Sequence, residues 1–139
     1  MKISMSLLTI VLMMGTAHAE TYKVAIHVDE NDPAVMNMAL NNAQNVEKYY
    51  EAQGDDVIVE VVAYGPGLNM FKLDSPVAAR IDAMSLDESY AFSACGNTHR
   101  KMSEKAGKDV PLLEGAQIVP SGVVRLIELQ REGYAYIRP

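Results

Sequence analysis

Short apolar runs alternate with segments of helical pattern along this chain, and the alternation constrains the fold more than any other feature. The runs with the length and Val/Ile content of strands are residues 22–28, 57–64, 90–95, 116–119 and 134–137. Only Glu60 interrupts the second run, as expected for a strand covered on both faces. Because strands that alternate with helices pair in parallel, we predict an α/β domain with a mainly parallel five-stranded sheet and helices on both faces.

The first two helices are marked by capping residues. Asp32-Pro33 and Ser75-Pro76 each place an N-cap residue before a proline, which favours the first turn of a helix. We expect helices over residues 33–53, where Gly54 stops the helix, and over residues 76–87. The sequence Gly65-Pro66-Gly67 between them predicts a turn.

An asparagine stripe marks one face of the first predicted helix. Asn37, Asn41 and Asn45 are spaced four residues apart and therefore share a face. Because asparagine is a poor helix former, the stripe suggests either a polar subunit interface or a solvated surface.

The first 19 residues have the features of a secretory signal peptide. Lys2 precedes an apolar run at residues 7–14, and Ala17-His18-Ala19 supplies small residues before a cleavage site at Glu20. The apolar run is much shorter than the roughly 20 residues of a membrane-spanning helix. We therefore predict a signal peptide over residues 1–19, a single exported domain over residues 20–139, and a periplasmic location.

The charge balance excludes two classes of partner. Loss of Lys2 with the signal peptide would leave 11 of the 12 basic residues against 18 acidic ones, a net charge of −7. Because an acidic protein is repelled by nucleic acid and by anionic lipid, we expect neither nucleic acid nor a membrane as a partner.

Cys95 is the only cysteine and the strongest candidate for chemistry. It ends the third apolar run, and Gly96-Asn97-Thr98 follows as a turn in which Asn97 or Thr98 is expected to cap a helix that ends by Gly107. The N-terminus of a helix lowers the pKa of a thiol, and the resulting thiolate can attack sulfane sulfur and carry it as a persulfide. The alternative is that Cys95 is a small buried apolar residue at a strand end.

Ligand sites in parallel sheets lie beyond the carboxyl ends of the strands. The exits of the second, third and fourth predicted strands supply the candidate binding residues, which are Tyr64, Gly65, Gly67, Gly96, Asn97, Thr98, Ser121, Gly122 and Arg125. Backbone N–H groups of residues 96–98 are able to cradle an anion, and Arg125 is able to hold an anionic donor. The alternatives are tight turns, simple helix capping and an ion pair between Arg125 and a surface carboxylate.

The histidines give no diagnostic signal for a metal. His27 and His99 are the histidines beyond the predicted signal peptide. His99 lies four residues after Cys95, where it could stabilise a thiolate or face solvent. Neither histidine has a spacing typical of metal ligands, so we expect no metal and no cofactor.

Several of these segments resemble the DsrE/DsrF-like sulfur-relay family. The resemblance extends over nearly the whole chain after the signal peptide and is carried by residues 27–30, 39–43, 61–67, 94–98, 119–123 and 132–137. It implies a compact three-layer α/β/α sandwich that assembles into a homo-oligomer, a trimer or a hexamer. It also implies that Cys95 is the acceptor cysteine that follows the third strand.

The resemblance implies a function in sulfur transfer. Relatives in this family pass sulfane sulfur between cysteines as carriers, so the donor would be a partner protein or a small sulfur anion. We expect an exported carrier that holds a persulfide on Cys95 without independent enzymatic turnover. The alternative is a non-catalytic oligomeric binding or assembly module in which Cys95 is buried and structural.

Overall fold

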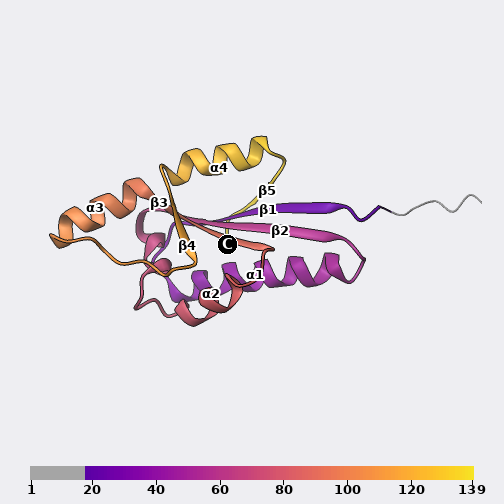
Figure 1. Cartoon of the computed structure of the whole chain (residues 1–139), viewed down its shortest axis with the longest axis horizontal. Helices are drawn as coiled ribbons and strands as arrows, with labels where there is room; N and C mark the ends of the chain where they lie inside the picture. Colours follow the sequence, from indigo (N-terminus) through magenta and orange to yellow (C-terminus); the bar gives the residue numbers. More distant parts are fainter. Residues whose placement is uncertain (1–17) are drawn as a thin grey trace, which may run out of the picture.

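The computed structural model describes residues 18–139, and a five-stranded parallel sheet lies at the centre of this part of the chain (Figure 1). The strands are β1 (Thr21–Val28), β2 (Asp56–Ala63), β3 (Tyr90–Cys95), β4 (Ala116–Val119) and β5 (Ala135–Ile137). Their order in the sheet is β4-β3-β2-β1-β5. The predicted α/β fold is confirmed, and every pair of neighbouring strands is parallel.

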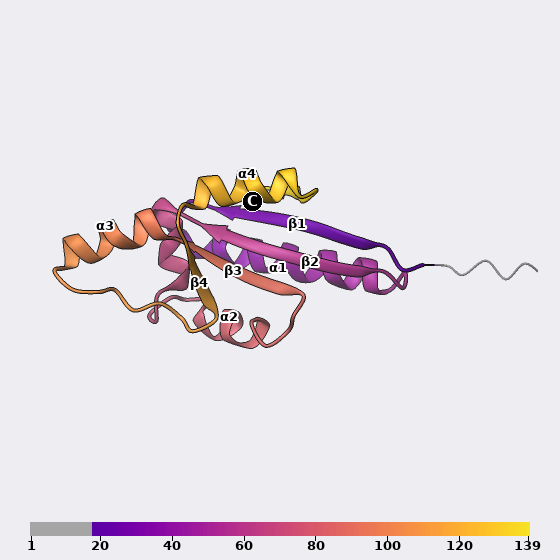
Figure 2. The ribbon, with the colours of Figure 1, turned by 45° about the horizontal axis from the view of Figure 1, so that its top comes forward.

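Helices cover both faces of the sheet. They are α1 (Pro33–Glu51), α2 (Ala78–Met84), α3 (Gly96–Ala106) and α4 (Gly122–Arg131), with a 3₁₀ helix, η1 (Gly65–Phe71), between β2 and α2. Figures 1 and 2 show α1 and α2 on one face and α4 on the other. Helix α3 projects beyond the carboxyl ends of the strands, and none of its residues, 96–106, is buried.

The local sequence explains most of the element boundaries. The Asp32 carboxylate accepts a 2.7 Å hydrogen bond from the Ala34 N–H, which confirms the predicted N-cap of α1. Helix α1 ends at Glu51, and Gly54 follows in a left-handed conformation with φ of 84°.

Three predicted boundaries are wrong. Residues 65–71 form η1 rather than a simple turn, and α2 begins at Ala78, two residues after Pro76. Cys95 itself is the N-cap of α3, so Asn97 and Thr98 lie inside the first helical turn rather than capping it. The helix begins earlier than predicted because the strand leads directly into Gly96.

The two faces of the sheet are packed unequally. The α1 face holds the larger core, which includes Ile26, Met36, Leu40, Phe71, Ile81 and Phe92. The α4 face holds a small cluster of Ala25, Val62, Leu126 and Leu129. On that face Ala91 of β3 and Gln117 of β4 stay exposed, and Val123, Val124 and Ile127 of α4 are about half exposed. Helix α4 therefore covers only part of its face of the sheet.

The asparagine stripe of α1 binds an arginine of the same chain. Nη1 of Arg80 donates to Asn37 Oδ1 at 2.9 Å, and Nη2 donates to Asn41 Oδ1 at 2.9 Å and to Gln44 Oε1 at 2.8 Å. Part of the stripe therefore fastens α2 to α1, whereas Asn45 is exposed.

The predicted signal peptide, residues 1–19, lies outside the described part of the chain except for its last two residues. No helix within residues 18–139 is long and apolar enough to cross a membrane.

Candidate functional site

Cys95 lies where the exits of three chain segments meet. It ends β3, its side chain is buried with 5% exposure, and α3 starts at the next residue. A Cβ atom on Gly122 would lie 3.0 Å from the Cβ of Cys95 and 3.1 Å from the Cβ of Tyr64. Gly122, the first residue of α4, is thus packed tightly between Cys95 and Tyr64, and a side chain at position 122 would push these neighbours apart.

Hydrogen-bond donors converge on the Cys95 thiol. Burial by itself raises the pKa of the thiol, because it disfavours the charged form. The backbone N–H of Gly122, the hydroxyl and N–H of Thr98 and the N–H of Asn97 are donor groups around the thiol that favour its charged form and lower its pKa. These donors outweigh burial, so the pKa of Cys95 lies below that of an ordinary cysteine. The arrangement favours a thiolate.

Thr98 is held in place by the first residue of η1. The Gly65 N–H donates a 2.9 Å hydrogen bond to the Thr98 Oγ1. Because the hydroxyl oxygen accepts from Gly65, its proton is free to be donated to the sulfur of Cys95. Gly65 has φ of 54°, a conformation that glycine adopts readily. The start of η1 therefore positions a donor on the thiol.

Two other glycines predicted to bind a ligand, Gly96 and Gly67, also have packing roles. A Cβ on Gly96 would lie 2.7 Å from the Val119 carbonyl oxygen, and one on Gly67 would lie 2.2 Å from the Val28 carbonyl oxygen. The absence of a side chain lets α3 begin against the end of β4 and lets η1 cross the end of β1.

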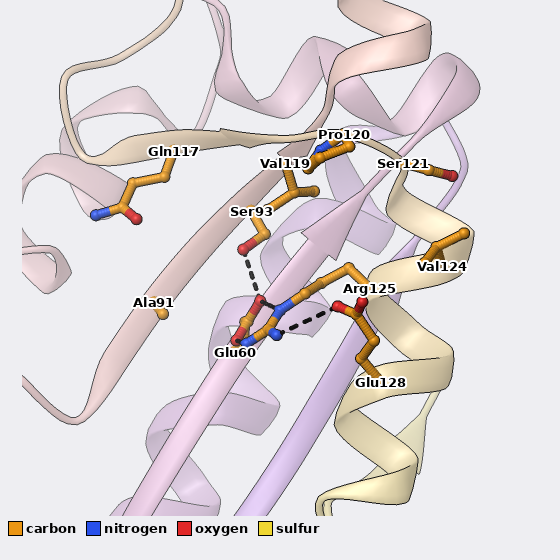
Figure 3. Close-up of a pocket in the computed structure, with 10 residues that line it drawn as sticks. All are labelled: Glu60, Ala91, Ser93, Gln117, Val119, Pro120, Ser121, Val124, Arg125 and Glu128. Carbon is orange, nitrogen blue, oxygen red and sulfur yellow. Dashed lines mark hydrogen bonds and ion pairs between the residues drawn. The ribbon is translucent and has the colours of Figure 1, made fainter.

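Arg125 belongs to a different cluster, which Figure 3 shows. Its Nε and Nη2 each donate a 2.7 Å hydrogen bond to the Glu60 carboxylate, to which the Ser93 hydroxyl also donates at 2.6 Å. The Glu60 side chain is only 6% exposed, so its charge depends on the guanidinium. The nearest carboxylate partner is thus a buried residue of β2, and the expected pairing with surface carboxylates is found as well, at longer distances, with Glu128 and Glu132.

The cluster borders a cavity of about 550 Å³ on the open part of the α4 face, lined also by Gln117, Val119, Ser121 and Val124. Glu128 and Glu132 lie 3.6 and 3.8 Å from Arg125, so three carboxylates surround one guanidinium. An anion bound at Arg125 would meet net negative charge. Ser121 is the N-cap of α4, but its hydroxyl accepts no hydrogen bond from the first turn, residues 122–125.

His27 of β1 is a buried polar residue beside this site. Its ring is 4% exposed, lies 4.4 Å from the Tyr64 ring, and its Nδ1 is 2.7 Å from the Tyr136 hydroxyl. Nε2 has no hydrogen-bond partner among residues 18–139. Burial lowers the pKa of His27, so the ring is held neutral.

The other histidine contacts the loop that precedes β4. His99 Nε2 lies 2.8 Å from the Val110 carbonyl oxygen, which ties α3 to the loop before β4. The donors on the sulfur come from the backbone and Thr98 instead. Within residues 18–139 no group of three His, Cys, Asp or Glu side chains could hold a metal ion.

Comparisons with known proteins agree with this architecture. No curated protein matches the chain. The solved structure of MTH1491 from Methanobacterium thermoautotrophicum, described as a protein of unknown function, is similar with a TM-score of 0.71 and 36% sequence identity. The similarity covers 85% of this chain and 99% of that one. The model of the DsrE/DsrF-like family matches residues 23–139, and the chain therefore belongs to the DsrE/DsrF-like family.

Proposed function

We propose that this protein is an exported sulfur carrier that holds sulfane sulfur as a persulfide on Cys95. The observation that carries the proposal is the convergence of backbone N–H groups and the Thr98 hydroxyl on one sulfur atom. These donors stabilise negative charge on the thiolate, and the same donors would stabilise the persulfide anion that replaces it. Membership of a sulfur-relay-type family supports the same reading.

The transfer step needs no metal or redox cofactor. The Cys95 thiolate attacks the sulfane sulfur of a donor such as thiosulfate or a polysulfide and forms a new S–S bond. The bond to the leaving group breaks, and the leaving group departs with the electron pair as sulfite or as a polysulfide shorter by one sulfur. A thiol acceptor attacks the terminal sulfur in the reverse sense and regenerates the thiolate. The protein carries sulfur without turnover of its own.

We further propose that the carrier is a homo-oligomer, a trimer or a hexamer, with the α4 face as a contact surface. Val123, Val124 and Ile127 are 53, 48 and 52% exposed on one helix. The neighbouring part of the sheet is not covered by α4. Apolar side chains grouped at an incompletely covered face are typical of a protein–protein contact.

The competing function is a non-catalytic binding or assembly module with a structural cysteine. The 5% exposure of Cys95 favours it, because a buried thiol is normally inert. Burial predicts a thiol that reacts slowly, whereas ionisation predicts one that reacts fast. The rate at which Cys95 reacts with thiol reagents therefore distinguishes the two functions.

The test is intact mass after brief incubation of the native protein with polysulfide at neutral pH. Wild type is expected to gain one sulfur atom and Cys95→Ser none. A matched control is Cys95→Ser/Asn45→Cys, which moves the thiol to an exposed position of α1. The carrier function requires faster sulfur uptake by Cys95 than by this relocated thiol. If Cys95 reacts with thiol reagents only after unfolding, the carrier function fails and the binding or assembly module remains.

A further inference from the structure

A groove leads from the surface to the residue that donates to the thiol. Its volume is about 340 Å³, and it is lined by Gly65, Pro66, Thr98, Lys101, Met102 and Lys105. One wall is the start of η1 and the other is one side of α3. Thr98 is shared by the groove and by the hydrogen bonds around Cys95. Thr98 therefore connects the groove to the surroundings of the thiol.

The lysines of this groove carry positive charge that no carboxylate of residues 18–139 neutralises through an ion pair. Lys101 and Lys105 are four residues apart, on one side of α3, and both are exposed. On the adjacent ridge of the helix, Arg100 pairs with Glu104 at 2.9 Å. Lys101 and Lys105 therefore form a small positive patch in a chain whose 18 acidic residues outnumber its 12 basic ones.

The charge therefore differs between the α4 face and the groove between η1 and α3. Arg125, on the α4 side, is surrounded by Glu60, Glu128 and Glu132. The side between η1 and α3 presents Lys101 and Lys105 next to Thr98. A small anion is attracted to the second side and repelled from the first.

We propose that the groove between η1 and α3 is the entry site for small anionic sulfane-sulfur donors, with Lys101 and Lys105 as the residues that select for negative charge. The inference rests on the carrier function proposed above and adds the substrate class and its route. Thiosulfate and inorganic polysulfide are dianions of the size that this cavity admits. The lysines bind and orient the donor, and Thr98 remains the donor to the sulfur of Cys95.

The test measures charge selectivity at Cys95 with methanethiosulfonate reagents that differ in charge. The thiolate attacks the sulfenyl sulfur and forms a mixed disulfide, and methanesulfinate leaves with the electron pair. Second-order rates are measured by intact mass with the anionic sulfonatoethyl, the neutral methyl and the cationic trimethylammonioethyl reagents. The relocated thiol of Cys95→Ser/Asn45→Cys gives the reference ratio for an exposed cysteine on the same protein.

Wild type is expected to prefer the anionic reagent over the cationic one more strongly than the relocated thiol does. Lys101→Gln/Lys105→Gln should slow the anionic reagent about threefold to tenfold at low ionic strength and leave the neutral reagent within about twofold. The effect should shrink as salt is added, because both lysines are exposed. The same variant should slow persulfide formation from polysulfide by a similar factor.

The control variant is Lys48→Gln/Arg131→Gln, which removes the same charge from exposed positions at the far ends of α1 and α4. It should leave the rate ratio unchanged. If Cys95 reacts with the neutral reagent but shows no selectivity that depends on Lys101 and Lys105, the groove is not the entry site and the carrier function stands. If native Cys95 reacts with none of the three reagents, the carrier function itself fails.

Discussion

The N–H of Gly65 donates to the Oγ1 of Thr98 at 2.9 Å, across 33 residues of chain, and the same hydroxyl is one of the groups that lower the pKa of Cys95. Thr98 thus links Gly65, which follows β2, to the thiol at the end of β3. Its hydroxyl uses acceptor and donor capacity at once, which a backbone N–H cannot do.

Thr98→Val is expected to raise the pKa of Cys95, because it removes one donor to the thiolate while keeping the shape of the side chain. The pKa of Cys95 is lowered in the wild type, so its alkylation rate persists below the pH at which an ordinary thiol loses reactivity. In Thr98→Val the pH profile of alkylation should move to higher pH. The unpaired Gly65 N–H should cost about 1 kcal/mol of stability.

Thr98→Ser is the control for this change, since it keeps the hydroxyl and loses one methyl group. Its pH profile should stay close to that of wild type. Profiles that coincide for the valine variant and wild type would show that the hydroxyl does not act on the sulfur.

The ion pair between Glu60 and Arg125 should dominate the stability of the α4 face. Arg125→Met leaves a carboxylate that is 6% exposed without its cation. A partner removed from a buried pair costs several kcal/mol, and since Arg125 is itself 26% exposed we expect about 2–3 kcal/mol. Urea denaturation measures the loss.

The double variant Glu60→Gln/Arg125→Met should recover part of that stability, because no charge then remains buried. Ser121→Ala, on the same cavity, should change stability by less than about 0.5 kcal/mol, since its hydroxyl makes no capping bond to residues 122–125. Equal losses in the single and double variants would contradict a buried charge as the cause.

Local sequence patterns correctly predict those strands and helix ends that are determined by residues adjacent in the sequence. The span of β3 was predicted from an apolar run that ends at a glycine, and the cap of α1 from Asp32-Pro33. The predicted start of α3 is too late because Asn97 and Thr98 have the side chains of cap residues, whereas Cys95 occupies the cap position without a side-chain capping bond. Side-chain type alone therefore predicts the wrong boundary for this helix.

Long-range pairs could not be predicted. Glu60 is the one charged residue in the apolar run 57–64. A carboxylate buried in such a strand needs either a neighbouring cation or protonation. Its partner Arg125 lies 65 residues away, and the sequence contains 12 basic residues. The contact of His27 with Tyr136 depends on β5 pairing with β1 at the edge of the sheet, which no local pattern specifies.

Gly122→Ala should perturb the thiol more than the overall fold of α4. The added methyl group would lie 3.0 Å from the Cβ of Cys95 and 3.1 Å from Tyr64, so these groups must move apart. We expect a loss of about 1–3 kcal/mol. The shift also moves the Gly122 N–H away from the sulfur, which raises the pKa of Cys95.

Thermal denaturation and the pH profile of alkylation measure the two effects of Gly122→Ala separately. Val123→Ala is the control, because the side chain of the next residue is 53% exposed and its loss should cost little. A glycine variant with an unchanged alkylation profile would show that the Gly122 N–H does not hold the thiolate.

His27 should make the protein less stable as the pH falls from 7 to 5. Burial lowers the pKa of the ring, an effect that Asp29 opposes and Arg138 reinforces. In the unfolded chain the imidazole takes up a proton near pH 6.5, whereas the folded protein resists protonation. The unfolded state therefore binds more protons, and the stabilisation present above pH 6.5 is lost as the pH falls toward the folded pKa, at no more than about 1.4 kcal/mol per pH unit.

The variant His27→Phe keeps an aromatic ring against Tyr64 and removes the titrating group. Tyr136, which is 42% exposed, can replace its lost partner with water. Urea denaturation at pH 5, 6 and 7 should therefore give a shallower dependence of unfolding free energy on pH for this variant than for wild type. Identical slopes would mean that acid sensitivity arises from carboxylates elsewhere and that His27 takes up protons equally in the folded and the unfolded state.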